Sequence, residues 1–415
     1  MDRKRHLIAA VCTIASISPQ ARFSCDASWG FYAHRLINRL AVFTLPEQMI
    51  EFYKVNIDYI TDHAVDPDKR RYAVKAEAMR HYIDLDQWIH SENDDLPRDF
   101  ASALLQRSKF YLSIDGEALS LFRDSIQIAL DPDTLWLSDS VLLMVCPARN
   151  YWTLMEFRIC LYENLMPEYD PASWSVPVTR LGGPFASLTT HGVLVIDDRF
   201  CPHGILPYHL ERCHRQLVHA FRAEDPVRIL RLSAELGHYL GDAHVPLHTS
   251  KNYNGQLTGQ DGIHAFWESR IPELFAADSF DYFVGPAYFL DDIRAAIWKI
   301  IFESHCGVED ILQTERTLRS VTPEDQQYCF EPRGGSLTMQ ACRNYAAAFN
   351  ARLNGQVEQR MRSCILATGC FWMSAWVEAG QPDLLRLYDK KTSLGDTTKS
   401  TPPLAPSWQW LRQHE

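Results

Sequence analysis

The sequence contains no long apolar segment. Every uninterrupted apolar run falls short of the roughly eighteen residues that a membrane-spanning helix requires, so we expect no transmembrane segment. Basic residues are also in the minority, because 41 lysines and arginines stand against 52 aspartates and glutamates, a formal net charge of -11. Such a balance argues against a broad electrostatic grip on duplex nucleic acid or an anionic membrane. Binding to either partner would need a local site.

Two further absences concern metal and redox chemistry. The chain has no H-E-x-x-H sequence, which a zinc peptidase would be expected to show, and no C-x-x-C pair. The ferritin-like di-iron proteins use paired E-x-x-H motifs, whereas this chain carries H-x3-D and H-x3-E. Of the eleven cysteines, Cys12 and Cys25 lie near the amino terminus. The other nine are irregularly spaced, an odd number that disfavours a framework built from disulfides alone.

The amino terminus has the pattern of a secretory leader. A basic cluster, RKR, precedes the apolar run LIAAVCTIASIS, and a polar stretch follows it. We predict that residues 1–28 are a signal peptide and that the protein is exported to the periplasm or secreted. An uncleaved, cytosolic chain is the alternative, because cleavage before Trp29 would place Asp26 where a small residue is usual.

The periodicity of apolar residues predicts an all-α fold. With 415 residues, 46% of them apolar, the chain can bury a large core, and the alternation typical of strands is almost absent. Helices are predicted from Trp29 to Leu45, after Pro46, from Leu206, after the capping Asp225, around Ile293 to Ile300, and from about Leu337 to Ala379. We expect one multi-helix bundle over residues 29–387, with residues 92–200 as an insertion of peripheral helices and loops. Residues 388–415 are polar and are expected to be a disordered tail.

The stretch from His238 to Glu268 has the spacing of a metal site. His238 and Asp242 are four residues apart in a predicted helix, so their side chains leave the same face. A proline should end that helix, which lets His248 return toward this face. His264 and Glu268 repeat the four-residue spacing on a second predicted helix. One such pair alone would usually be solvated or packed in the core. Two pairs with a fifth ligand favour a cation, and imidazole and carboxylate ligands without cysteine suit a hydrolytic zinc site.

These five residues resemble the signature of a known enzyme superfamily. The zinc-dependent bacterial phospholipases C and single-strand-specific nucleases are all-helical enzymes with three zinc ions. Their signature H-x3-D-x5-H, followed by H-x3-E or H-x3-D, is matched by His238, Asp242, His248, His264 and Glu268. The combination is highly specific, and the resemblance covers roughly residues 29–92 and 203–280.

The resemblance implies further ligands in the amino-terminal part of the chain. Family enzymes begin at a tryptophan whose amino group and carbonyl oxygen bind one zinc, with a histidine a few residues later, and Trp29 and His34 fit this pattern. A carboxylate and a histidine one loop apart complete the site. Asp66 and His81 match in spacing and order, with Asp68 as the alternative to Asp66. Without the resemblance, a lone His81 among apolar residues would be interpreted as a core residue.

Three zinc sites are implied, and Asp242 would bridge two of them. The first would take Asp66, His81, His238 and Asp242, the second His248, His264 and Glu268, and the third Trp29, His34 and Asp242. The second site has only three protein ligands, which leaves a position open for water. A non-catalytic zinc-binding helical protein, the alternative function, would need every position filled.

The implied reaction is hydrolysis of a phosphodiester by a zinc-activated water. Asp66 would orient or deprotonate that water, and Lys69 would neutralise charge that grows on the phosphoryl oxygens. The alternative for the DPDKRR segment, which holds both residues, is a solvated turn, the more common role of an exposed run of this kind.

The substrate stays open between a phospholipid and a single-stranded nucleic acid. Glu268 in place of an aspartate resembles the phospholipase branch, whereas the short Trp29 to His34 spacing resembles the nuclease branch. Tyr253 lies between the two ligand helices and is predicted to bind substrate, because an aromatic ring can stack on a base or cage a choline group.

Overall fold

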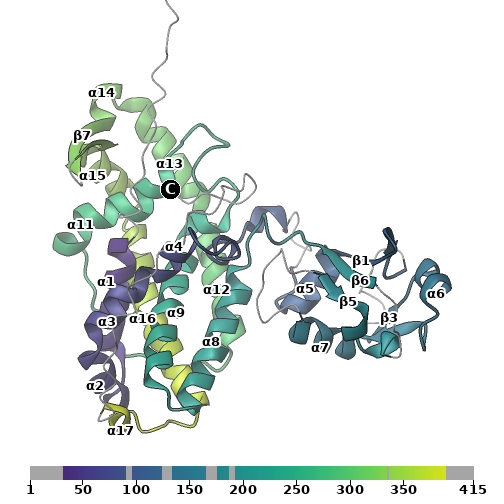
Figure 1. The fold of residues 1–415 in the computed structure, drawn as a ribbon. Helices are drawn as coiled ribbons and strands as arrows, with labels where there is room; N and C mark the ends of the chain where they lie inside the picture. Colours follow the sequence, from purple (N-terminus) through teal and green to yellow (C-terminus); the bar gives the residue numbers. More distant parts are fainter. Residues whose placement is uncertain are drawn as a thin grey trace, which may run out of the picture.

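The computed structural model describes residues 31–89, 96–123, 133–164, 175–186, 192–333 and 336–388. The predicted leader, Trp29 and the tail from residue 389 lie outside these ranges. Figure 1 shows two parts, a long helical body and a smaller lobe beside it that contains strands. Within the described ranges, no helix has the length and apolar character that a bilayer crossing requires.

The helical body is built from the two ends of the described chain. Its helices are α1 (Phe31–Ala41), α2 (Glu47–Val55), α3 (Ile57–Asp62), α4 (Asp66–Arg70), α8 (Leu206–Arg222), α9 (Pro226–His244), α10 (Ile263–Ala265), α11 (Ile271–Ser279), α12 (Ile293–Cys306), α13 (Val308–Val321), α14 (Glu324–Gln327), α15 (Arg343–Arg352), α16 (Gln356–Glu378) and α17 (Leu385–Tyr388). Helix α9 is central, because α1, α8, α12 and α16 all pack against it (Figure 1). The mainly helical character predicted from the sequence is confirmed for this body.

Helix α9 begins and ends where its sequence predicts. The Asp225 carboxylate accepts a hydrogen bond from the backbone N–H of Arg228, and Pro226 occupies the first turn. Pro246 has no N–H to continue the ladder, and a short 3-10 helix, η8 (Pro246–Thr249), follows instead. This turn carries His248 back toward the face that bears His238 and Asp242.

The prediction of an all-α fold is wrong for the lobe within residues 92–200. It contains helices α5 (Phe100–Arg107), α6 (Asp139–Val145) and α7 (Leu154–Asn164), and strands β1 (Lys109–Ile114), β2 (Glu117–Ser120), β3 (Thr134–Trp136), β4 (Tyr151–Thr153), β5 (Ser175–Pro177) and β6 (Gly192–Asp197). One antiparallel sheet has the order β2-β1-β6-β5, and β3 pairs with β4. Along β1, Phe110, Leu112 and Ile114 are buried and their neighbours face outward. Strands of three to six residues are too short to give a clear period-two signal.

Aromatic side chains join the lobe to the helical body. Trp88 stacks on Phe200 with 4.5 Å between ring centroids. Phe100 of α5 lies 4.8 Å from Tyr208 of α8 by the same measure, and the Tyr208 hydroxyl donates to the Pro97 carbonyl. The lobe is therefore anchored on α8 by a packed apolar junction.

The carboxyl-terminal region differs from the long helical region predicted from about Leu337 to Ala379. A hairpin of β7 (Tyr328–Arg333) and β8 (Ser336–Ala341) comes first, and a disulfide between Cys329 and Cys342 ties its base. Asn354 and Gly355 then adopt positive φ values of 52° and 78°, which ends α15 before α16 begins. Gly380, with φ of 92°, follows the end of α16 as predicted.

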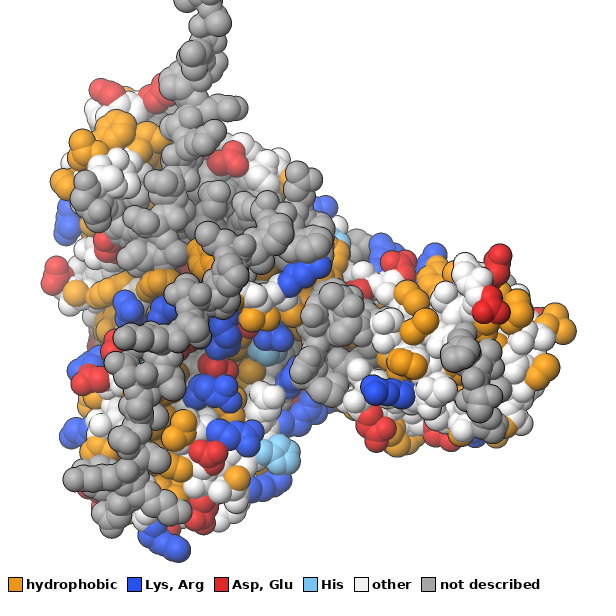
Figure 2. Space-filling model, viewed as in Figure 1, with side chains coloured by type: hydrophobic (Ala, Val, Ile, Leu, Met, Phe, Trp, Pro, Cys, Tyr) orange, Lys and Arg blue, Asp and Glu red, His pale blue; other side chains and the backbone are white. Residues whose placement is uncertain are grey.

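Charged side chains are interspersed over the surface. On the face drawn in Figure 2, basic side chains gather over the middle and lower part of the helical body with single acidic side chains among them, and hydrophobic side chains are scattered between them. The lobe also exposes single apolar side chains, such as Leu143 and Met155, at 83% and 63%. Basic side chains are therefore prominent on the described part of this face, although the chain as a whole is acidic.

Candidate metal centre

Eight side chains from seven parts of the helical body converge beside α9. They are His34 (α1), Asp68 (α4), His81 (after the turn Ala78–Arg80), His238 and Asp242 (α9), His248 (η8), His264 (α10) and Glu268 (the π-helical turn Phe266–Arg270). All are buried except Asp68, whose side chain is 17% exposed. Three groups of three among them have ligand atoms within 4.8 Å of one another, so each group can hold a metal ion.

One group matches a predicted set in full. His248 Nε2 lies 2.8 Å from His264 Nε2 and 3.3 Å from Glu268 Oε2, and His264 Nε2 lies 2.7 Å from the same carboxylate oxygen. The turn that carries Glu268 is a π-helix rather than the regular α-helix predicted. Such turns are rare and occur often at functional sites.

A second group gathers on the opposite side of Asp242. His81 Nδ1 lies 2.9 Å from Asp242 Oδ2 and 3.1 Å from His238 Nε2. The Asp68 carboxylate completes it, with Oδ1 3.9 Å from both imidazole nitrogens.

Asp242 connects these ligands to His34. Its Oδ1 atom lies 3.6 Å from His34 Nε2, while its Oδ2 atom faces His81 and His238. The His34 ring also stacks on His238, with 4.1 Å between centroids. A carboxylate whose two oxygens face two ligand groups is suited to bridge two cations. Trp29, the third member predicted for the His34 site, lies outside the described residues.

Backbone carbonyls set which imidazole nitrogens point inward. His238 Nδ1 donates to the Ala64 carbonyl oxygen at 2.8 Å, and His248 Nδ1 donates to that of His81 at 2.6 Å. In each neutral ring Nε2 is then the atom with the lone pair. Anchoring of this kind is usual for metal-ligating histidines. The sequence gives no sign of these carbonyl partners, because they come from distant segments.

The electrostatics of the cluster favour bound positive charge. Burial raises the pKa of a carboxyl group, but the surrounding imidazoles outweigh it and hold the pKa values of Asp242 and Glu268 below their usual range. For His238, burial dominates and lowers the pKa to about 3, so this ring is neutral near pH 7.

Burial lowers the pKa values of His34, His81 and His248 as well, but the neighbouring carboxylates outweigh it and raise them, that of His34 to about 9. A cation that binds these three rings must therefore displace protons from them. The donor set and its charge therefore fit a bound cation.

The structure brings Asp68, and not Asp66, to the ligand group. The Asp66 carboxylate lies 2.9 Å from the Lys69 ammonium and also contacts His63 Nδ1. Asp66 and Asp68 lie two residues apart on the one-turn helix α4, so their side chains point in different directions, and that of Asp68 points toward His81. The ligand role predicted for Asp66 stays a prediction, and the geometry favours its alternative. The Lys69 side chain is exposed and forms an ion pair with Asp66.

Substitution of each aspartate by asparagine separates the two assignments. We expect Asp68→Asn to weaken metal binding at least tenfold, since changes even to the partners of metal ligands cost about 10- to 100-fold in affinity. Asp66→Asn should leave the affinity within about twofold. Titration of the metal-free variants with zinc against a competing chelator measures both. The reverse order of effects would restore Asp66 as the ligand.

Tyr253 lies beside the centre, as its position between the ligand helices suggests. Its ring meets that of His264 edge to face, with 5.8 Å between centroids, and it is half-buried. It is therefore placed to contact a molecule bound at the His248, His264 and Glu268 group.

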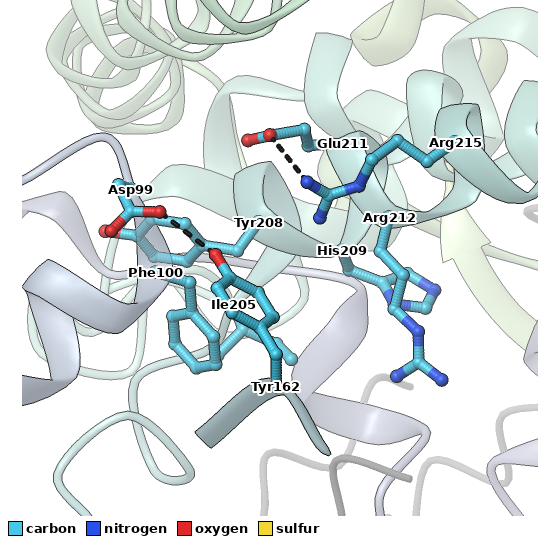
Figure 3. Close-up of a pocket in the computed structure, with 9 residues that line it drawn as sticks. All are labelled: Asp99, Phe100, Tyr162, Ile205, Tyr208, His209, Glu211, Arg212 and Arg215. Carbon is cyan, nitrogen blue, oxygen red and sulfur yellow. Dashed lines mark hydrogen bonds and ion pairs between the residues drawn. The ribbon is translucent and has the colours of Figure 1, made fainter. Parts of the chain in front are cut away.

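A separate pocket lies at the junction of the lobe and α8 (Figure 3). The Tyr162 hydroxyl donates to the Asp99 carboxylate at 3.1 Å across it, and Arg215 donates to Glu211 at 3.2 Å. Asp99 and Glu211 are thus each paired within the pocket, and none of the eight converging side chains lines it.

No protein-family model matches the chain, and no curated protein does. The resemblance to the zinc-dependent phospholipases C and nucleases therefore stays a prediction from the motif residues.

Proposed function

We propose that this protein is a zinc-dependent hydrolase that cleaves phosphodiesters. The observation that carries the proposal is the position of Asp242 between two sets of imidazoles, with Oδ2 beside His81 and His238 and Oδ1 beside His34. The group of His248, His264 and Glu268 offers a further cation position. Adjacent cation sites that share a carboxylate are suited to phosphoryl chemistry, because two positive centres can stabilise both the attacking and the leaving oxygen. The superfamily resemblance adds zinc as the metal and three as the number of ions.

The residues of the chain would hold the metals and shape the site. Bound zinc supplies Lewis acidity toward a phosphoryl oxygen and acidifies a water molecule near neutral pH. Lys69 would offset negative charge on the substrate, and Asp66, which Lys69 and His63 hold in place, would orient the attacking water or accept its proton. Because Asp66 contacts these two partners and Asp68 faces the metal ligands, the two aspartates would divide orientation and ligation between them.

Phospholipid and single-stranded nucleic acid stay as the two substrate candidates. Tyr253 is expected to bind either one, since stacking on a base or a cation–π contact with a choline group is worth about 1 to 3 kcal/mol. We expect Tyr253→Ala to raise KM about 5- to 100-fold and to leave the metal content unchanged. Steady-state kinetics with elemental analysis tests this, with Tyr288→Ala, an exposed tyrosine on a different segment, as the matched control. An unaltered KM on every cleaved substrate would remove Tyr253 from the binding site.

The proposed function is tested on the purified full chain. Phosphatidylcholine, single-stranded DNA and RNA are offered separately, before and after treatment with a chelator and after zinc is restored. We expect cleavage of at least one substrate, its loss with chelator and its return with zinc, and elemental analysis close to three zinc ions per chain. Activity that persists without metal would contradict the proposal. Tight zinc binding without cleavage of any of the three would favour the non-catalytic alternative.

Export belongs to the same proposal. The amino group of Trp29 becomes a ligand only when the chain is cut before that residue, so the third zinc would require removal of residues 1–28. Terminal sequencing of protein recovered from the periplasm or the medium should begin at Trp29. A different first residue would leave His34 and Asp242 as an incomplete site.

A further inference from the structure

His81 differs from the other anchored histidines in which nitrogen faces the cluster. His238 and His248 direct Nε2 inward and donate Nδ1–H to backbone carbonyls. His81 is turned the other way, with Nδ1 2.9 Å from Asp242 Oδ2 and 3.1 Å from His238 Nε2. If Nδ1 is its ligand atom, the proton of the neutral ring must lie on Nε2.

The group that Nε2 of His81 faces is the carboxylate of Glu77. The two atoms, His81 Nε2 and Glu77 Oε1, are 3.7 Å apart, and both side chains are only 1% exposed. The short turn Ala78–Arg80 between the two residues brings Glu77 under the imidazole ring. A carboxylate in this position favours the Nε2–H form and makes the opposite nitrogen a stronger ligand than a carbonyl would.

Glu77 is itself held rigidly. Arg80 Nη1 donates to Glu77 Oε2 at 2.8 Å, Arg70 Nε donates to the same oxygen at 3.4 Å, and the Tyr239 hydroxyl donates to Oε1. Two guanidinium groups and a tyrosine hydroxyl therefore fix the carboxylate where it faces the ring.

We propose that Glu77 is a positioning residue of the metal centre, which fixes His81 in the form that presents Nδ1 to the cation. The inference rests on the proposed metal site but not on any substrate. Glu77 touches neither the cation position nor the reacting groups, and it acts through His81. The competing explanation is that Glu77 serves only as the counterion of Arg70 and Arg80.

Zinc affinity measured on the full chain distinguishes the two explanations. Metal-free wild type, Glu77→Gln and Glu77→Asp are titrated with zinc against a competing chelator, and their folding is compared by circular dichroism and thermal unfolding without metal. Glu77→Gln keeps the shape of the side chain and removes its charge, so we expect affinity at the His81 site to fall about 10- to 100-fold. Glu77→Asp restores the charge on a shorter stem and should recover part of the loss.

Glu235 provides the matched control. It also accepts a hydrogen bond from Arg70, at 2.7 Å, but the described contacts do not bring it to His81. Glu235→Gln thus removes a counterion of Arg70 and should leave zinc affinity within about threefold. The double variant Glu77→Gln with His81→Ala should bind zinc as His81→Ala alone does, because the path through His81 is already lost.

Three results would overturn the inference. They are equal zinc affinity of wild type and both Glu77 variants, an equal loss in Glu235→Gln, or additive losses in the double variant. If Glu77→Gln does not fold, the zinc affinity of Glu77→Asp tests the inference instead. An affinity equal to that of the wild type would then contradict it. A wild type that binds no zinc would overturn the proposed function together with this inference, whereas zinc binding that ignores Glu77 would overturn the inference alone.

Discussion

We expect Asp242→Ala to remove bound metal and the proposed phosphodiesterase activity together. Its carboxylate lies 2.9 Å from His81 and 3.3 Å from His238 through Oδ2, and its Oδ1 lies 3.6 Å from His34, so one substitution takes a ligand from adjoining sites. Loss of metal-supplied stabilisation of several kcal/mol corresponds to about a thousandfold or greater fall in kcat/KM. Elemental analysis and kinetics on the same preparation measure both effects.

The control for this substitution is at the start of the same helix. Asp225 caps α9 through the backbone N–H of Arg228, and no metal group includes it. Asp225→Ala should cost about 1 kcal/mol of stability through loss of the cap, with metal content unchanged. A folded Asp242→Ala protein that keeps its full metal content and activity would contradict the metal centre proposed here.

The proposed ligands on and after α9 could be predicted from the sequence because they lie close to one another along the chain. Residues four apart on a helix share a face whatever surrounds it, so His238 and Asp242 could be paired from sequence alone. The return of His248 followed from the proline at 246, which cannot continue the helix. His264 and Glu268 kept their pairing even though the turn between them is a π-helix.

Features that depend on distant contacts could not be predicted in this way. The choice between Asp66 and Asp68 depends on how the short helix α4 is oriented against α9, and both aspartates fit the motif spacing approximately. Glu77 stands four residues before His81, a weak signal among the many charged residues of this segment. Its position opposite the ring is known only once the turn between them is known.

The strands of the lobe could not be predicted from the sequence for the same reason. Strand β1 pairs with β6 from Lys109 opposite Asp197 to Ile114 opposite Gly192, so its sheet is formed by residues far apart in the chain. Short strands of this kind acquire stability from their partners and from packing, and single-segment periodicity carries little of that information. Helices with a sustained apolar stripe, such as α8, were predicted where they occur.

We expect Gly241→Ala to displace His34 from the proposed metal centre, although Gly241 itself is not a ligand. A Cβ atom on Gly241 would lie 2.5 Å from Nδ1 and 2.7 Å from Cε1 of His34, which is buried and stacked on His238. In an exposed helix this change would add about 1 kcal/mol of stability through propensity. Here the ring must leave its place, so we expect loss of the metal that His34 holds and destabilisation of about 1 to 3 kcal/mol.

Gly237→Ala, one helical turn earlier, separates loss of the ligand from loss of packing. Its Cβ would lie 1.9 Å from Oδ1 of Asn38, a buried residue of α1 that donates to the Ala234 carbonyl and belongs to no metal group. Both variants therefore disturb the same contact between α1 and α9, and both should unfold at lower temperature. Only Gly241→Ala should lower the metal content, by one ion per chain. Equal metal loss in both variants would mean that the α1–α9 contact as a whole, and not the position of His34, maintains the site.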